Sequence, residues 1–234
     1  MKLFIKYIVS SFLVFTVVAG QAQDSLQVEL KTDSTILQKT KQPLTIIPAL
    51  DYGKLATTAI HWDTKYEFNL SVVVFNHIRI NADYGHGELE PKNAIENGKY
   101  ISTGDYYRAG LDYQFEIATK TFLSFGGMYA SSTFKDEGQV DIPSEIWPSL
   151  SESFARQNFN AQWAEFVITT EKVVANREQG PLAHLYVGAK FRLRFLINRP
   201  RPENFDVYAI PGYGRTFNNV VPAANLFVAY RIEL

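Results

Sequence analysis

Two of the four histidines lie beside an aspartate, a pairing that can activate a hydroxyl nucleophile. His61 and Asp63 occur in "HWD", and His86 follows Asp83 in "DYGHG". A histidine oriented by an acid can remove a proton from a hydroxyl group, as acyl-transfer enzymes require. No serine is fixed beside either histidine by the sequence. The pairs therefore support a lipid-modifying enzyme only as an alternative interpretation.

A second set of chemically active side chains recurs at every other position of "LYVGAKFRLRFLI", residues 185–197. Its cationic members are Lys190, Arg192 and Arg194. The positions between them are apolar, and the face predicted to be lipid-facing comprises Leu185, Val187, Phe191, Leu193 and Phe195. Because a strand alternates its side chains between two faces, this segment is predicted to be a strand with one apolar and one cationic face.

The same period of two recurs along most of the chain beyond Leu44. It predicts eight strands and no convincing amphipathic helix between them. The predicted strands cover residues 44–53, 66–75, 78–88, 104–116, 121–133, 157–173, 183–197 and 222–234. The register of 157–173 is ambiguous, because Trp163 shares a parity with Glu165 and Glu171, and a bulge would reconcile the pattern.

The polar faces of these strands carry acids and bases in similar number. The predicted charge network consists of Asp51, Arg79, Asp83, Arg108, Asp112, Glu116, Glu165, Glu171, Lys190, Arg192, Arg194 and Arg231. Glu67 and Glu233 also lie on polar faces. Five of the bases are arginines, which suit crowded, multiply hydrogen-bonded pairing with carboxylates. This composition favours a packed polar interior over a solvated exterior.

Two architectures produce this alternation, and they are inside-out versions of each other. A soluble, lipocalin-like barrel lines its interior with the apolar face, whereas a membrane barrel turns that face to lipid. The connections decide between them. Those at 53–66, 88–104, 133–157 and 197–222 are long, and those at 75–78, 116–121 and 173–183 are shorter. Long loops on one side and short turns on the other, with an even strand count, are typical of outer-membrane barrels.

The fold class is therefore predicted to be all-β, a single antiparallel up-and-down transmembrane β-barrel of eight strands with a filled polar lumen. Eight strands leave an interior just wide enough for side chains, so the charges are expected to plug the barrel. Arginine or lysine facing lipid near the midplane would cost about 2–4 kcal/mol each. The expected partners are outer-membrane lipids and other outer-membrane proteins.

The N-terminus predicts export. Lys2 and Lys6 precede an apolar run, and small residues follow, the layout of a secretory signal peptide over residues 1–22. Residues 23–43 are polar and are expected to form a flexible periplasmic lead-in to the barrel at 44–234. The net charge of −1 becomes −3 on removal of the two lysines. Neither value indicates a nucleic-acid-binding surface.

Several chemistries lack their residues or motifs. Cysteine is absent, which excludes disulfides, thiolate metal sites and a cysteine nucleophile. The sequence has no phosphate-binding glycine loop, metalloprotease motif or calcium loop. No metal and no cofactor are expected.

Two long connections are the candidate contact regions. Residues 134–157 mix acids with apolar side chains, and their Trp147 could dock a partner or fold over the barrel mouth. Residues 198–215 hold Arg199 and Arg201 among prolines that favour a stiff, extended segment. The arginines could bind lipopolysaccharide phosphate or a partner, and a stiff surface loop without a ligand is the alternative.

Several short motifs resemble a known family. They are "GQAQ", "LDYGK" (50–54), "NADYGHGEL" (81–89), "GDYYRAGLDYQ" (104–114), "WAEFV" (163–167) and "IPGYGR" (210–215). The chain resembles small outer-membrane barrel proteins of Bacteroidota, classed as a domain of unknown function. The resemblance implies fold and location and carries over no catalytic residue. One departure is the final Leu234, where many such barrels end in an aromatic residue.

The function expected from the sequence is that of a non-enzymatic outer-membrane barrel that acts through its extracellular loops or as an accessory subunit of an assembly. Two alternatives stay open: an outer-membrane enzyme that modifies lipid, and an inverted soluble periplasmic binding barrel with an apolar cavity.

Overall fold

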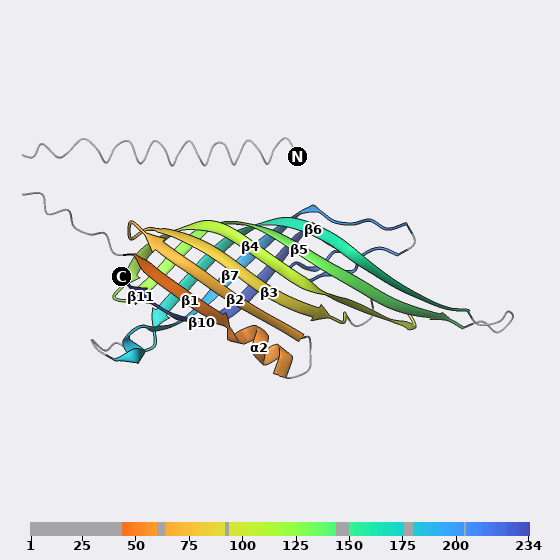
Figure 1. Ribbon diagram of the computed structural model, residues 1–234, viewed down its shortest axis with the longest axis horizontal. Coiled ribbons are helices and arrows are strands. Elements are labelled where there is room, and N and C mark those ends of the chain that lie inside the picture. Colours follow the sequence, from red (N-terminus) through yellow and green to blue (C-terminus); the bar gives the residue numbers. More distant parts are fainter. Residues whose placement is uncertain (1–43, 60–63, 92–93, 144–149, 176–179, 204) are drawn as a thin grey trace, which may run out of the picture. The chain divides into compact units, whose positions relative to one another are not determined.

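The computed structural model describes residues 44–59, 64–91, 94–143, 150–175, 180–203 and 205–234. Eight antiparallel strands form a closed barrel in sequence order (Figure 1). The strands are β1 (Thr45–Asp51), β2 (Thr64–Val74), β3 (Ile78–Leu89), β4 (Gly98–Ala118), β5 (Thr121–Ile142), β6 (Leu150–Val173), β7 (Leu185–Asn198) and β10 (Val220–Tyr230), which β11 (Ile232–Glu233) continues past Arg231.

Closure depends on the first and last strands. β1 pairs with β2 through Thr45–Leu50 and with β10 through Ala49–Asp51, and β11 extends that contact at Thr45 and Ile46. All neighbouring barrel strands are antiparallel. Each pairs with the next barrel strand along the chain, and the β1–β10 pair closes the ring. The predicted all-β up-and-down barrel is therefore confirmed.

The pleat separates the side chains as the period of two predicts. Apolar side chains on the outer face are largely exposed, and polar or charged ones on the inner face are buried. Large exposed apolar side chains come from seven strands and include Phe68, Leu70, Ile80, Leu111, Tyr129, Phe166, Phe191, Leu193 and Leu226. The inverted barrel with an apolar cavity is wrong, because this face points outward.

Buried apolar side chains lie in separate groups, and the charges occupy the lumen. One group contains Ile47, Val173 and Phe227, near the short turns. Another, toward the long connections, contains Trp163, Ile210 and Tyr213. Trp163 points inward together with Glu165 and Glu171. The β6–β7 ladder does shift register at Gln162 and Trp163, yet the tryptophan stays on the inner face.

Three strands run well past the rest of the barrel (Figure 1). β4 begins at Gly98, β5 ends at Ile142 and β6 begins at Leu150, so each is longer than predicted. The prediction of a loop at 134–157 is wrong for 134–142 and 150–157, which are strand. The period of two is absent there because polar side chains occupy both faces, as at Lys135, Asp136 and Glu137.

Helices are few. The α-helix α2 (Tyr52–Ala59) follows β1 directly, and the short 3-10 helix η1 (Pro181–Ala183) precedes β7. The expectation of no helix between the strands is wrong at α2, whose eight residues are too short to show a clear period. Asp51 begins it as an N-cap, since its Oδ1 accepts a 3.0 Å hydrogen bond from the Lys54 amide. Within the described ranges, no helix is long and apolar enough to cross a membrane.

A two-stranded ribbon lies in the connection between β7 and β10. It pairs β8 (Ala209–Ile210) with β9 (Gly214–Arg215). Val207, Ile210 and Tyr213 are completely buried, so this connection folds inward.

Candidate functional site: the charged lumen and its covered mouth

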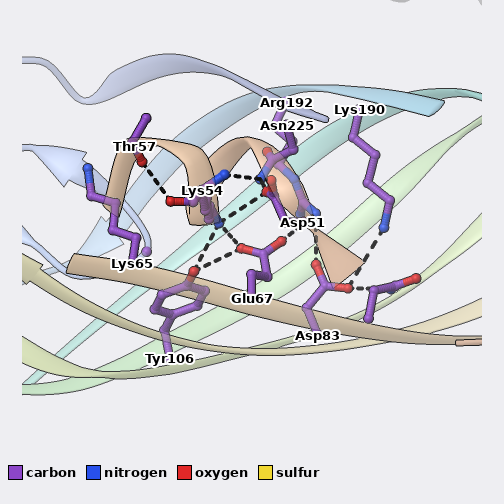
Figure 2. Close-up of polar contacts among 12 residues, drawn as sticks. Asp51, Lys54, Thr57, Lys65, Glu67, Asp83, Tyr106, Lys190, Arg192 and Asn225 are labelled. Atoms are coloured by element: carbon purple, nitrogen blue, oxygen red, sulfur yellow. Dashed lines mark hydrogen bonds and ion pairs between the residues drawn. The ribbon is translucent and has the colours of Figure 1, made fainter. Parts of the chain in front are cut away.

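Two arginines and three acids form the centre of the lumen, and Figure 2 shows three of them, Arg192, Glu67 and Asp83. Arg108 donates to Glu67 at 2.7 Å and to Glu165 at 2.8 Å. Arg192 donates to Glu165 at 2.7 Å and to Asp83 at 2.8 Å. All five side chains are at most 4 % exposed. Each acid therefore contacts an arginine from another strand, which ties together strands distant in sequence.

A smaller cluster lies toward the short turns. Arg79 contacts Glu171 at 3.2 Å, and Arg231 contacts the other oxygen of the same carboxylate. Gln114 accepts a 3.0 Å hydrogen bond from Arg231, whose guanidinium also lies 3.7 Å from the centre of the Phe122 ring. One carboxylate shared by two arginines needs such additional partners, because an unpaired buried charge is strongly destabilising.

The structure buries all but one of the residues predicted for the charge network. The buried ones are Asp51, Arg79, Asp83, Arg108, Asp112, Glu165, Glu171, Lys190, Arg192, Arg194 and Arg231. Glu116 is exposed and accepts a 2.6 Å hydrogen bond from the Lys120 amide. It lies outside the network, close to the end of β4 at Ala118, just before the turn.

The apolar face of β7 lies opposite these charges. Val187, Phe191, Leu193 and Phe195 are between 41 % and 56 % exposed. Leu185, at the start of the strand, is half-buried. A single strand thus presents apolar side chains outward and three cations inward.

Two important lumen residues escaped the period-two analysis. Lys54, from α2, reaches the lumen and contacts Glu67, and it donates a 2.9 Å hydrogen bond to the Tyr106 hydroxyl (Figure 2). Tyr106 donates to Glu67 at 2.9 Å. A Cβ on Gly85 or Gly212 would collide with the Tyr106 ring, so both glycines are required for it to fit. The recurring "YG" pairs were the only sequence signal near these residues, and they do not indicate which side chain packs against the glycines.

The connection between β7 and β10 covers the mouth of the barrel. Arg108 donates to the Gly212 carbonyl at 3.0 Å, and Arg194 donates to the Tyr213 carbonyl at 2.7 Å. Arg199 forms a two-bond pair with Asp206 inside the same connection. Of the two predicted contact arginines, only Arg201 is exposed. The interpretation as a stiff surface loop is wrong for 207–213, which is anchored by buried arginines.

A partly buried ion pair joins two of the extended strands. Arg156 of β6 contacts both carboxylate oxygens of Asp136 in β5, with Nε to Oδ1 at 2.9 Å. Tyr100 of β4 donates to the same carboxylate at 2.9 Å. Burial and the Asp136 charge raise the pKa of Tyr100 above its usual value, which keeps the hydroxyl a hydrogen-bond donor. Phe154 and Phe205 stack beside them, 5.0 Å between ring centres.

Of the two predicted histidine–aspartate pairs, only His86 and Asp83 lie among the described residues. His61 and Asp63 lie outside the described residues, as does Trp147. His86 does not pair with Asp83, because residues three apart in a strand point to opposite faces. Its Nδ1 lies 2.8 Å from Asp105 of β4, whose carboxylate also accepts a 3.1 Å hydrogen bond from Tyr84. The sequence places no nucleophile beside this partly buried pair.

The two glutamates at the centre of the lumen each accept several hydrogen bonds. Glu67 accepts from Arg108, Arg192 and Tyr106, and Glu165 accepts from Arg108, Arg192 and Trp163. Hydrogen bonds between arginine and carboxylate are among the strongest in proteins, so these contacts stabilise the packed lumen. Among the described residues, no three histidine, aspartate or glutamate side chains gather in a way that could hold a metal ion.

Comparison with known proteins identifies a family and several structures of similar layout. The family model described as "Domain of unknown function (DUF6048)" matches residues 4–234. Among curated proteins, none matches this chain.

Three solved structures illustrate the similarity. Neisserial surface protein A has 10 % identity and a TM-score of 0.39, over 82 % of this chain and 97 % of its own. A major outer membrane protein of Thermus thermophilus has 8 % identity and a TM-score of 0.46, over 82 % and 99 %. Ail, the attachment invasion locus protein of Yersinia pestis, has 10 % identity and a TM-score of 0.33, over 82 % and 97 %.

Proposed function

We propose that this chain, which belongs to the DUF6048 family, is a closed outer-membrane barrel that binds a partner through its extended extracellular strands. The proposal rests on one observation: the barrel has a filled lumen and an apolar exterior, and its strands β4, β5 and β6 continue as a three-stranded sheet past the other strands. The proposed role is non-enzymatic. The partner can be another protein of a larger outer-membrane assembly, in which this chain is an accessory subunit.

The apolar exterior supports a place in the membrane. Side chains such as Leu111, Phe191 and Leu226 are 46–59 % exposed, and comparable ones occur on seven strands around the barrel. An apolar band of this extent is unfavourable in water and matches the lipid-facing band of outer-membrane barrels. The predicted export signal supports the outer membrane as the location.

The filled lumen supports a closed barrel. Arg108 and Arg192 cross-link acids from β2, β3 and β6, and the connection between β7 and β10 lies over them. An eight-stranded barrel leaves little room beyond these side chains.

The extended strands support a binding role at the cell surface. One face of this three-stranded sheet is buried against the 205–213 connection through Tyr100, Asp136 and Phe154. The other face is exposed, with polar side chains at Lys99, Lys135, Glu137, Gln139, Ser153 and Gln157 and a small one at Ala155. A rigid, mixed-charge sheet fits a polar partner surface, because complementary charges set orientation and association rate.

The membrane placement can be tested with single cysteines, since the chain has none. An environment-sensitive fluorophore at F191C or R192C, in liposomes with brominated lipid tails, should be strongly quenched at position 191 and weakly at 192. Absence of quenching at both positions would overturn the membrane placement. Planar-bilayer recordings of the same protein should show no steady conductance.

The binding role can be tested by site-specific photo-crosslinking in intact cells. Crosslinkers at Lys135 and Gln139, on the exposed face of the sheet, should yield a discrete adduct. A crosslinker at Ile80, on the lipid-facing side of β3, is the matched control. An identical adduct pattern at all three positions, or none at Lys135 and Gln139, would refute binding through the extended strands.

A further inference from the structure

The barrel wall has a seam where β1 ends before its neighbours. The last partners of β1 are Phe68 in β2 and Phe227 in β10. β2 continues through 64–67 and β10 through 220–226 without a β1 partner. Toward the long connections, no strand therefore lies between these two segments. We call the gap between residues 64–67 and residues 220–226 the seam.

Helix α2 covers the seam (Figure 1). It contacts both β2 and β10. Thr58 lies on the exposed edge of β2, with its hydroxyl 2.9 Å from the Lys65 carbonyl oxygen and 2.8 Å from the Lys65 amide. Pro222 falls in the β10 side of the seam, as expected for a strand edge that lacks a ladder partner. A few side-chain hydrogen bonds thus replace a continuous ladder.

A cavity of about 460 Å³ lies at this seam. Its lining joins two sides of the wall. Tyr106, Arg194 and Leu89 belong to the buried inner face, whereas Ala224 and Leu226 belong to the exposed outer face of β10. Lys54 and Thr57 line it from α2. The volume is in the range of small-molecule sites, and the cavity leads from the lumen toward the lipid-facing exterior.

The charged side chains that line the cavity are mostly cationic. Lys54, Lys65 and Arg194 line it together with one acid, Asp51. Lys54 in turn contacts Glu67 of the lumen. Figure 2 shows Lys54, Lys65 and Asp51 of this group together with Glu67.

The Arg194 guanidinium is only partly compensated, although one of its nitrogens donates to the Tyr213 carbonyl at 2.7 Å. Its Nε lies 3.6 Å from Glu165 Oε1, an oxygen that already accepts hydrogen bonds from Arg108 at 2.8 Å and Trp163 at 2.7 Å. That Nε is buried and has no hydrogen-bond partner among the described residues, and Arg194 as a whole is 8 % exposed. A buried guanidinium that lines a cavity with an unsatisfied donor is suited to bind an anion.

We propose that this cavity binds the acidic headgroup of a membrane lipid that enters through the seam. The carboxylate or phosphate lies against Arg194 and Lys54, and the acyl chain passes over Leu226 and leaves beside Leu55, which is 39 % exposed. The inference rests on the membrane placement proposed above but not on the binding role of the extended strands. An apolar tail distinguishes this ligand from a soluble anion, because the outer wall of the cavity is apolar.

The test uses a fluorophore at L55C, with F191C as the matched control, in phosphatidylcholine nanodiscs that contain increasing dibromostearic acid. Quenching at L55C should saturate at a low mole fraction, whereas quenching at F191C should rise in proportion to the acid. Dibrominated phosphatidylcholine should give no saturable component at either position. Equal, unsaturable curves at L55C and F191C would overturn the lipid site.

Substitutions distinguish loss of lipid binding from loss of folding. R194Q should raise the half-saturating mole fraction at least tenfold, and R201Q, at an exposed arginine, should leave it unchanged. Because R194Q could fail to fold, T57W provides a second probe that fills the cavity from the helix and should abolish saturation. Retained saturation in T57W, or an unchanged value in folded R194Q, would overturn the proposal.

Two further controls identify the source of failure. Phenyl phosphate in the buffer should not displace the brominated acid, and full displacement would overturn the lipid source in favour of a soluble anion. If F191C is not quenched by brominated phosphatidylcholine, the membrane placement itself is wrong. If F191C is quenched and L55C shows no saturation, only the lipid site is wrong.

Discussion

Arg108 Nη2 donates a 3.0 Å hydrogen bond to the carbonyl of Gly212, 104 residues further along the chain. The same guanidinium donates to Glu67 and Glu165. One side chain therefore joins β2, β4 and β6 to the connection that covers the barrel mouth. It makes the lumen and the covered mouth a single unit.

Removal of Arg108 should destabilise the barrel strongly. R108M keeps an extended side chain but leaves Glu67 and Glu165 without this partner, and loss of one member of a buried ion pair costs about 3–5 kcal/mol. Urea unfolding in liposomes would measure the loss. R201M, at an exposed arginine, should stay within about 0.5 kcal/mol of the parent. Equal effects of the two substitutions would contradict the assigned role.

Trp163 should report on the packed lumen. Its indole donates a 2.7 Å hydrogen bond to Glu165 and is completely buried. W163F removes that donor from a charged acceptor, at a cost of about 1.5–3 kcal/mol. The substitution should also remove the blue-shifted emission of this buried tryptophan from the spectrum of the folded protein. A folded W163F with parental stability would show that this hydrogen bond contributes little.

Phe191 should tolerate apolar but not charged replacements. It is 56 % exposed on the outer face of β7. F191R should lower stability in bilayers by about 2–4 kcal/mol if the position is near the midplane, because lipid-facing charge is unfavourable there. F191L is the matched control and should behave like the parent. Equal stability of the arginine and leucine variants would place this face in water.

Replacement of residues 206–216 by a short glycine-serine linker should leave the barrel closed to ions. The paired side chains of Arg79, Arg108 and Arg192 still occupy the lumen below that segment. Planar-bilayer recordings should show no steady conductance in either parent or variant. Steady conductance in the variant alone would assign the closure to the connection instead of the lumen.

The partly buried His86–Asp105 pair should have no catalytic role. H86A and D105N break a 2.8 Å contact on the outer surface, and no nucleophile is fixed beside it by the sequence. Mass spectrometry of lipid A from cells that express each variant should match the parent. A change in acylation present with the parent and lost in both variants would support the enzyme alternative.

The sequence alone determined the fold class because it depends on a local rule. A period of two separates charged from apolar side chains on each strand, so Lys190, Arg192 and Arg194 could be assigned to one face before any contact was known. The loop lengths favoured the membrane barrel over the inverted one. The closed structure then excluded the inverted barrel, because its charged side chains are buried and its apolar side chains are exposed.

Only the tertiary structure decided which charges meet and where the wall is incomplete. Arg192 contacts Asp83, 109 residues away, because barrel closure and strand register bring β3 and β7 across the lumen. Periodicity could not place Lys54 or extend β5 past residue 133, since a short helix and a sheet with polar side chains on both faces carry no period-two contrast. The seam between β2 and β10 follows from the length of β1 relative to its neighbours, a relation between elements that no single segment encodes.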